Sequence, residues 1–400
     1  MTLSATSPLR AQSTRIQSID LLRGVVMIVM ALDHVRDYFH ADAFLFNPVD
    51  VERTNVALYV TRWITHFCAP VFVFLAGTSG FMVGVRKGKK ELSAFLFKRG
   101  LWLIILELTL INFAWQFNIT FAFQALTVIW ALGVGMVVLS VAIHLPFKVI
   151  LTLGLILVAG HNLLDSFHVE GTGASALGWA ILHDPRIFQI GPVTLFVGYP
   201  IIPWTGVMLL GYCFGSLYLP SVDKEKRKKT LLQLGLIAIA AFVFIRFINY
   251  YGDPSPWFTQ RDGMHTVLSF FNVTKYPPSL LYVLVTLGPA LIFLALSEKL
   301  TGKISQYVIG LGRVPMFYYI IHIFLIHSLG VIAAMATGFQ ASDMIFSSWI
   351  TDSPNLKGYG FSLGVVYLVW IGVVLSLFPI CLWYDRYKIN HKKKWWLSYL

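Results

Sequence analysis

Long apolar stretches alternate with short polar segments along almost the whole chain. A helix needs about 20 mostly apolar residues to cross the hydrocarbon layer of a bilayer, and the stretches approach or reach that length. They are continuous and lack the alternating pattern of a membrane-spanning β-barrel. The pattern predicts an all-α, polytopic integral membrane protein with about ten transmembrane helices. The predicted spans are Ile19–Phe39, Val60–Val83, Ala94–Phe113, Gln124–Leu145, Val149–Leu164, Pro200–Leu219, Leu231–Tyr251, Ser279–Leu296, Val314–Ala336 and Phe361–Tyr384.

The composition excludes an ordinary soluble globular protein. Hydrophobic residues make up 57% of the chain and charged residues only 12%, whereas soluble domains contain about 25% charged residues. The cysteines lie within apolar stretches and match neither a disulfide framework nor a metal site. We therefore interpret Cys68, Cys213 and Cys381 as small core residues.

The positive charges indicate how the chain is oriented in the membrane. If the amino terminus is cytoplasmic, the inner segments hold most of the 31 Lys and Arg residues, as the positive-inside rule requires, and both termini are cytoplasmic. The net charge of +12 then reflects contact with membrane lipids and not with nucleic acid. We divide the chain into an uncleaved cytoplasmic tail (1–18), a single transmembrane domain (19–385) and a basic cytoplasmic tail (386–400) that anchors at the lipid headgroups.

Four connections on the predicted outer side are long and rich in Gly, Pro and aromatic residues. They are 41–59, 165–199, 252–278 and 337–360. Long loops of this kind are usually functional, which favours an activity on the extracytoplasmic side. The alternative is that they serve only as connectors with interfacial helices.

The first span contains the strongest candidates for chemistry. Arg23 and His34 are eleven residues apart, which on a helix is about 20° from three full turns and about 16 Å of rise. The two side chains therefore share a face at opposite ends of the span. His34 is a candidate general base, oriented by Asp33 or Asp37. The alternative is that His34 only hydrogen-bonds a neighbouring helix.

Other ionisable residues in or near the spans have weaker claims on a site. Arg23 is a candidate for binding a cytoplasmic phosphate, or else a positive-inside anchor. Arg62 and His66 lie one helical turn apart near the outer surface and are weaker candidates for binding a substrate. Glu107 and Arg246 fall in the outer halves of two spans, and we predict that they form a buried ion pair.

The remaining histidines give no metal motif. His322 and His327 are five residues apart, so they do not share a helical face, and a two-histidine metal site is not expected from that spacing. Core hydrogen bonding is the favoured interpretation of His322, although it could also face a cavity. We predict no metal in this protein.

Five segments together resemble a known family. They are RIQSIDLLRGVVMIVMALDH (15–34), HFCAPVFVFLAGTSG (66–80), FKRGLWLIILE (97–107), YPIIPWTGVMLLGYCFG (199–215) and KYPPSLLYVLVTLG (275–288). The chain resembles the bacterial membrane family related to heparan-alpha-glucosaminide N-acetyltransferase, in the transmembrane acyltransferase superfamily. The spacing of Arg23 and His34 is also similar to a signature of integral-membrane O-acyltransferases that modify surface polysaccharides.

The resemblance implies that an acyl group, with acetyl the first candidate, moves from cytoplasmic acyl-CoA to an extracytoplasmic sugar-type acceptor. It implies a multi-pass protein of the bacterial inner (cytoplasmic) membrane. Arg23 would then contact the CoA phosphates, and either His34 or His40 would be the base. A homodimer is one arrangement that the sequence allows. The alternative function is a transporter or flippase for a lipid-linked or small anionic solute, with the same buried charges as a proton relay.

Overall fold

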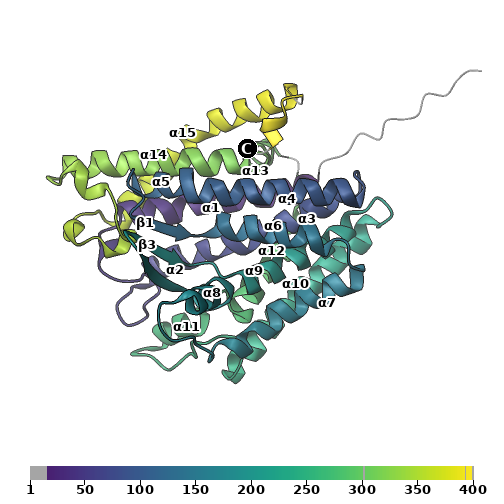
Figure 1. The fold of residues 1–400 in the computed structure, drawn as a ribbon, viewed down its shortest axis with the longest axis horizontal. Coiled ribbons are helices and arrows are strands. Elements are labelled where there is room, and N and C mark those ends of the chain that lie inside the picture. The colour runs from purple at the N-terminus through teal and green to yellow at the C-terminus, as the bar shows by residue number, and fades with distance from the viewer. Residues whose placement is uncertain (1–15, 301, 392, 399–400) are drawn as a thin grey trace, which may run out of the picture.

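The computed structural model describes residues 16–300, 302–391 and 393–398. Most of these residues form helices that run side by side across the view in Figure 1. The helices are α1 (Gln17–Phe39), α2 (Val56–Trp63), α3 (Cys68–Gly84), α4 (Lys89–Leu106), α5 (Asn112–Gln116), α6 (Val128–Ala142), α7 (Phe147–Gly160), α8 (Ala174–Leu182), α9 (Ile201–Phe214), α10 (Lys224–Ile248), α11 (Gly263–Phe271), α12 (Leu280–Ser297), α13 (Lys303–Gly312), α14 (Pro315–Ala336) and α15 (Leu363–Asn390).

The boundaries of the two predicted tails differ from the ends of the described helices. Residues 1–15 of the predicted amino-terminal tail lie outside the described residues, and α1 begins at Gln17. At the other end, α15 continues to Asn390, so the first residues of the predicted basic tail extend a helix.

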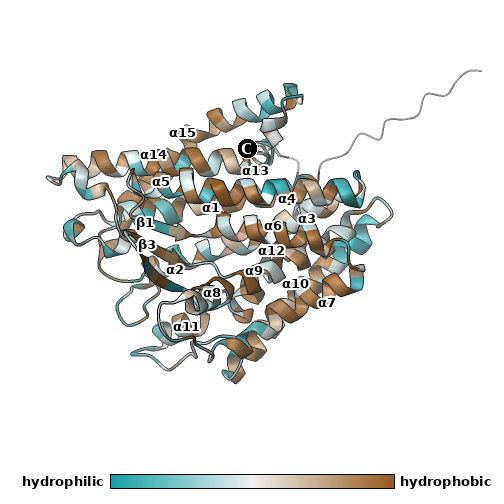
Figure 2. Ribbon diagram, viewed as in Figure 1, coloured by the Kyte–Doolittle hydropathy of each residue, from teal (hydrophilic) through white to brown (hydrophobic). Residues whose placement is uncertain are grey.

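Seven helical segments in the described part of the chain are long and apolar enough to cross a membrane. They are Val56–Gly84, Phe147–Leu164, Ile201–Tyr218, Lys224–Ile248, Leu280–Ser297, Pro315–Ala336 and Leu363–Asn390. Each overlaps one predicted span. Figure 2 shows apolar residues along the middle of the helices and polar residues gathered towards the two ends of the molecule. The chain is therefore a mostly helical, multi-pass membrane protein.

The other three predicted spans correspond to helices that are more polar or shorter. Helix α1 carries charged residues along its length. Helix α4 continues through a π-helical turn, Glu107–Ile111, into α5. Helix α6 is apolar but has only 15 residues.

A small three-stranded sheet was not predicted. It consists of β1 (Phe123–Leu126), β2 (Arg186–Ile190) and β3 (Val193–Val197) in the order β1-β3-β2. Strand β3 pairs parallel to β1 and antiparallel to β2. The predicted span Gln124–Leu145 therefore begins in a strand, and α6 starts only at Val128. The reason is that β1 pairs with a segment about 70 residues later, a contact that leaves no local pattern.

The four long connections meet at the end of the molecule that holds the sheet, α2, α8 and α11 (Figure 1). The Arg261 guanidinium donates to the carbonyls of Glu52 and Thr54, which joins 252–278 to 41–59. The rings of Phe196 and Trp349 pack with centroids 5.4 Å apart, which joins 165–199 to 337–360. The 3₁₀ turns Ala41–Phe44 and Ile350–Asp352 also contact each other, which joins the two pairs, so the four loops form one packed layer.

Helices α3 and α9 cross in close contact because glycines replace side chains at the crossing. A Cβ atom on Gly211 would collide with the Phe74 carbonyl, and one on Gly77 would collide with the Met208 carbonyl. The Thr78 hydroxyl also donates to the Gly211 carbonyl at 3.0 Å. Small residues of this kind let membrane helices approach closely.

We expect Gly211→Ala to destabilise the protein because its methyl group would force α9 away from α3. Overpacking of this kind costs about 1–3 kcal/mol, enough to lower the thermal midpoint of detergent-solubilised protein by several degrees. Gly372→Ala in α15 is the control, since a Cβ atom there meets nothing within 4 Å. Equal midpoints for the two variants would contradict the packing argument.

Candidate functional site

A cavity of about 440 Å³ lies beside the carboxyl-terminal half of α1. Its walls combine charged side chains of α1 with aromatic side chains of the long connections. The residues that line it are Met30, Asp33, His34, Arg36, Asp37, Leu45, Phe46, Asn47, Pro48, Arg62, Thr65, Cys68, Ala69, Phe72, Trp115, Thr127, Val128, Phe196, Tyr199, Lys275, Tyr276, Tyr319, Trp349, Thr351 and Asp352. A cavity that combines charged and aromatic side chains is the strongest candidate site in the described part of the chain.

His34 lines this cavity and is held by a second histidine from α14. Its Nδ1 atom lies 2.8 Å from Nε2 of His322, and Nδ1 of His322 lies 2.9 Å from the Tyr318 carbonyl oxygen. A carbonyl only accepts, so the proton of His322 must be on Nδ1. Its Nε2 atom then accepts from the Nδ1–H of His34. This chain of hydrogen bonds leaves Nε2 of His34 as the nitrogen with a free lone pair.

The side chain of His34 is packed on a second side by an aromatic ring. Trp115 meets it edge to face, with centroids 4.7 Å apart and an interplanar angle of 74°. The side chain is therefore held in one orientation by both a hydrogen bond and packing. A fixed tautomer and a fixed ring are what a general base requires.

The prediction that Asp33 or Asp37 orients His34 is wrong. Asp33 accepts from Nη1 of Arg62 at 2.8 and 3.0 Å and from Nη2 of Arg36 at 2.8 Å. Asp37 accepts from the same Arg36 nitrogen at 2.7 Å. Buried guanidinium groups need carboxylate partners, and Arg36 and Arg62 bind both nearby carboxylates. Asp33 also points about 100° away from His34, because the two residues are consecutive on a helix.

His40 has a structural role at the end of α1. Its Nδ1 atom accepts from the Asp42 amide at 3.1 Å, which caps the short 3₁₀ helix Ala41–Phe44. Burial lowers the pKa of His40. The described cavity lining includes His34 and not His40.

Only one member of the predicted pair Arg62 and His66 reaches the cavity. Arg62 lines it and is bound to Asp33. His66 is buried behind the wall, where its ring meets Tyr282 with centroids 5.4 Å apart. The segment between Arg62 and His66 explains the difference, because the helix changes there from α2 to the 3₁₀ turn Ile64–Phe67.

Arg23 connects α1 to α3 at the opposite end of α1. It donates to Asp20 and to the Leu75 carbonyl, each at 3.2 Å, and also to the Ser79 hydroxyl. Helix α1 runs unbroken from Gln17 to Phe39, so the predicted rise of about 16 Å between Arg23 and His34 applies.

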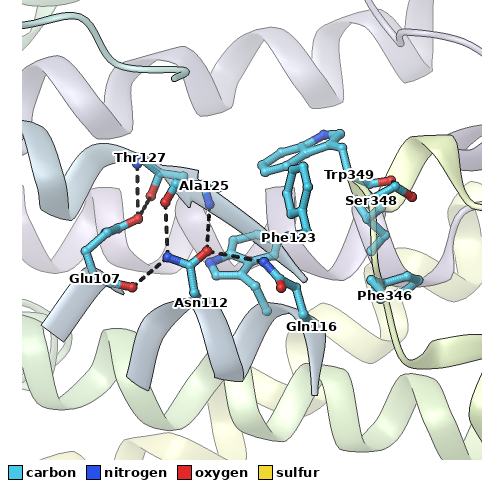
Figure 3. A pocket seen from close by; sticks show the side chains of 11 residues that line it. Glu107, Asn112, Gln116, Phe123, Ala125, Thr127, Phe346, Ser348 and Trp349 are labelled. Atoms are coloured by element: carbon cyan, nitrogen blue, oxygen red, sulfur yellow. Dashed lines mark hydrogen bonds between the residues drawn. The ribbon is translucent and has the colours of Figure 1, made fainter. Parts of the chain in front are cut away.

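The predicted ion pair between Glu107 and Arg246 is wrong. Arg246 donates to the carbonyls of Phe270, Ser255, Ser269 and Asn272 at distances from 2.6 to 3.0 Å. Glu107 accepts from the amide and the hydroxyl of Thr127 at 3.0 and 2.6 Å, as Figure 3 shows. Each side chain forms hydrogen bonds within its own part of the structure. The prediction assumed that residues at equal depth in the membrane lie on neighbouring helices, which need not be so.

Glu107 belongs to a small pocket next to the main cavity. The pocket has a volume of about 20 Å³ and shares Trp115, Thr127 and Trp349 with the larger cavity. In Figure 3, Asn112 lies between Glu107 and the β1 backbone; its side chain accepts from the Ala125 amide at 2.7 Å and donates to the Ala125 carbonyl at 3.1 Å. The unusual π-helical turn at Glu107 is thereby joined to the sheet.

Sequence reasoning missed several residues of the cavity. Lys275 lies over the Tyr276 ring, 5.1 Å from its centroid, and no carboxylate in the described residues lies within salt-bridge distance of its ammonium. Tyr319 comes from α14, and Trp349 comes from the last long connection. His322, whose favoured interpretation was core hydrogen bonding, lies behind His34 and is absent from the described cavity lining. The motif KYPPSL marked the start of a span and so offered a signal for Lys275. For Trp349 we find no such signal in the sequence.

The correction for Glu107 and Arg246 makes a prediction. Arg246→Lys should lower the thermal midpoint, because an ammonium has three donors and no planar fork for four carbonyls. Glu107→Gln should act separately, so the free-energy effects of the two changes should add to within about 0.5 kcal/mol in the double variant.

Arg227 and Glu298 provide the positive control for that cycle. They form a two-point ion pair at 2.7 and 3.0 Å, so Arg227→Lys and Glu298→Gln should be coupled. Coupling between Glu107 and Arg246 as large as in this control would contradict the structure.

Comparison with known proteins assigns the chain to a family. The sequence matches the profile of the family described as heparan-alpha-glucosaminide N-acetyltransferase, catalytic, over residues 15–247. A search among curated proteins gives no matching sequence. The matched region includes Arg23, His34 and Arg62, whereas Lys275 and His322 lie beyond it. Since the match covers more than half of the chain, this protein belongs to the heparan-alpha-glucosaminide N-acetyltransferase catalytic family.

Proposed function

We propose that this protein transfers an acetyl group from cytoplasmic acetyl-CoA to a sugar-type acceptor on the outer side of the membrane. The family implies a membrane acyltransferase with an acetyl-CoA donor. The observation that carries the proposal further is the free Nε2 lone pair of His34 at the cavity, fixed from behind by His322. We place the protein in a bacterial inner membrane, with ten spans and both termini cytoplasmic.

In the proposed reaction, Nε2 of His34 takes the proton of the acceptor hydroxyl or amine. The acceptor oxygen or nitrogen attacks the thioester carbonyl carbon, the carbon–sulfur bond breaks, and the CoA thiolate leaves. The thiolate then takes the proton from His34, so protons and charges balance. His322 supports the transient imidazolium, because the Nδ1–H of His34 keeps its acceptor throughout.

The walls of the cavity suit a sugar. Trp349 and Phe72 offer apolar ring faces to the carbon face of a sugar ring, and Asp37 and Asp352 offer acceptors to its hydroxyl groups. Lys275 supplies a positive charge at the same cavity for an anionic group or for the oxyanion that forms during acyl transfer. This mixture of aromatic, acidic and basic groups would bind a polar carbohydrate better than an apolar chain.

The donor would arrive from the other end of α1. The inner loop that follows α3 is rich in exposed Lys and Arg, including Lys87 and Lys89, and it can attract the CoA phosphates. Arg23 lies at this end, about 16 Å along the helix from His34. That separation suits the extended pantetheine arm, whose thioester would then reach the base.

We expect His34→Gln to lower transfer of ¹⁴C-acetyl from acetyl-CoA by about 100-fold or more, because the variant keeps a polar side chain and loses the base. His322→Gln should lose part of the activity by releasing the His34 tautomer. The assay would offer glucosamine, and glycans from the membranes of the cells that produce the protein, as acceptors. His40→Gln is the matched control and should keep its activity. Full activity of a folded His34→Gln variant would overturn the assignment.

We expect Arg23→Gln to weaken binding of acetyl-CoA to the purified protein by about tenfold or more, because a charge-assisted phosphate contact is lost. Arg261→Gln is the control. It removes a positive charge at the opposite end of the molecule, and this variant should bind acetyl-CoA as tightly as the wild-type protein. Thermal midpoints would separate binding from folding. A destabilised Arg23→Gln variant with unchanged affinity would show that Arg23 only ties α1 to α3. Solute movement into vesicles without any need for CoA would instead support a transporter.

A further inference from the structure

A second group of histidines lies outside the cavity, at the outer end of α7. His161 begins the 3₁₀ turn that ends α7, Asp165 follows that turn, and His183 comes directly after α8. One ligand atom from each side chain lies within 4.8 Å of the other two. None of the three lines the cavity beside α1 within the described residues. The group is therefore separate from the proposed reaction.

The histidines of this group are buried with unused nitrogens. His161 and His183 are each only 2% exposed. Within the described chain, neither ring nitrogen of His161 has a well-aligned hydrogen-bond partner, and Nδ1 of His183 has none. A buried polar atom without a partner costs about 1–3 kcal/mol. Three such nitrogens lie on two neighbouring histidine side chains, which indicates that a ligand binds them.

The third side chain completes a set of metal ligands. Asp165 Oδ1 lies 3.1 Å from Nε2 of His183, and the rings of His161 and His183 meet edge to face with centroids 5.5 Å apart. Asn162 donates to the other carboxylate oxygen of Asp165 at 2.8 Å. Such an outer contact is typical of ligating carboxylates, since it holds the remaining oxygen on the metal.

We propose that His161, Asp165 and His183 bind a divalent transition-metal ion, with Zn²⁺ the best fit. Two imidazoles and one carboxylate form a common zinc ligand set, whereas Mg²⁺ and Ca²⁺ prefer oxygen ligands alone. Ligands around a tetrahedral zinc ion lie about 3.3 Å apart, so small side-chain rotations would bring the three atoms into place. Water would occupy the fourth position.

The ion would join parts of the outer layer that share few other contacts. His161 and Asp165 belong to the end of α7, while His183 leads through Asp184 into β2. Strand β3 pairs with β2, and Phe196 of β3 lines the cavity. The metal would therefore fix the sheet, and with it one wall of the cavity, to the end of a membrane helix. Its role is structural, and it does not depend on the proposed function.

The test uses the full-length protein in detergent, stripped with a chelator and reloaded with Zn²⁺ or Co²⁺. We expect one zinc ion per chain by mass spectrometry, a rise in thermal midpoint on zinc addition, and the visible absorption of four-coordinate Co²⁺. His183→Gln and Asp165→Asn should each lose all three signals. His168→Gln is the matched control, because His168 lies in the same segment, is 54% exposed and pairs with Asp184.

The outcomes of this test either establish the metal site or overturn it. Retention of the metal by His168→Gln and its loss from the other two variants would establish the site. Equal binding by all the variants, or no stoichiometric zinc in the wild-type protein, would overturn it. Acyl transfer is not needed as a readout, so failure of the proposed enzyme activity would leave this result interpretable.

Discussion

Pairing of the buried charges of α1 is the constraint on which the rest of the arrangement depends. A buried carboxylate or guanidinium without a partner costs several kcal/mol. Asp33 lies in the middle of an apolar run, and it obtains Arg36 from the next turn and Arg62 from the next helix. Arg23 binds the backbone of α3 at the other end. The two contacts fix α2 and α3 against α1, and α12, α13, α14 and α15 also pack against it.

This pairing also decides the chemistry of His34. Because the arginines take both nearby carboxylates, the partner of His34 is a neutral imidazole. On the proposed mechanism, this neutral partner fixes the tautomer of His34 and accepts its Nδ1–H throughout the proton transfer. The charge cluster and the histidine pair therefore act as neighbouring but separate networks.

The features that could be predicted from sequence are those that depend on local periodicity. Apolar length identified the helices, and the phase of Arg23 and His34 along α1 follows from helix geometry alone. Contacts between distant segments could not be predicted. His34 and His322 are 288 residues apart in the chain, and β1 meets β3 without a local signal. The Glu107–Arg246 prediction failed for a related reason, because span boundaries give depth in the membrane but not direction around a helix.

The cavity joins the two parts of the chain that the family match separates. The matched region, 15–247, supplies His34 and the charge cluster of α1. The later region supplies His322, which sets the tautomer, together with Lys275 and Trp349 at the wall. On the proposed mechanism, the groups that perform the proton transfer come from the first part, and many groups that face the acceptor come from the second. Relatives could then change their acceptor by changing the later loops, while the histidine pair, which spans both parts, holds the reaction in place.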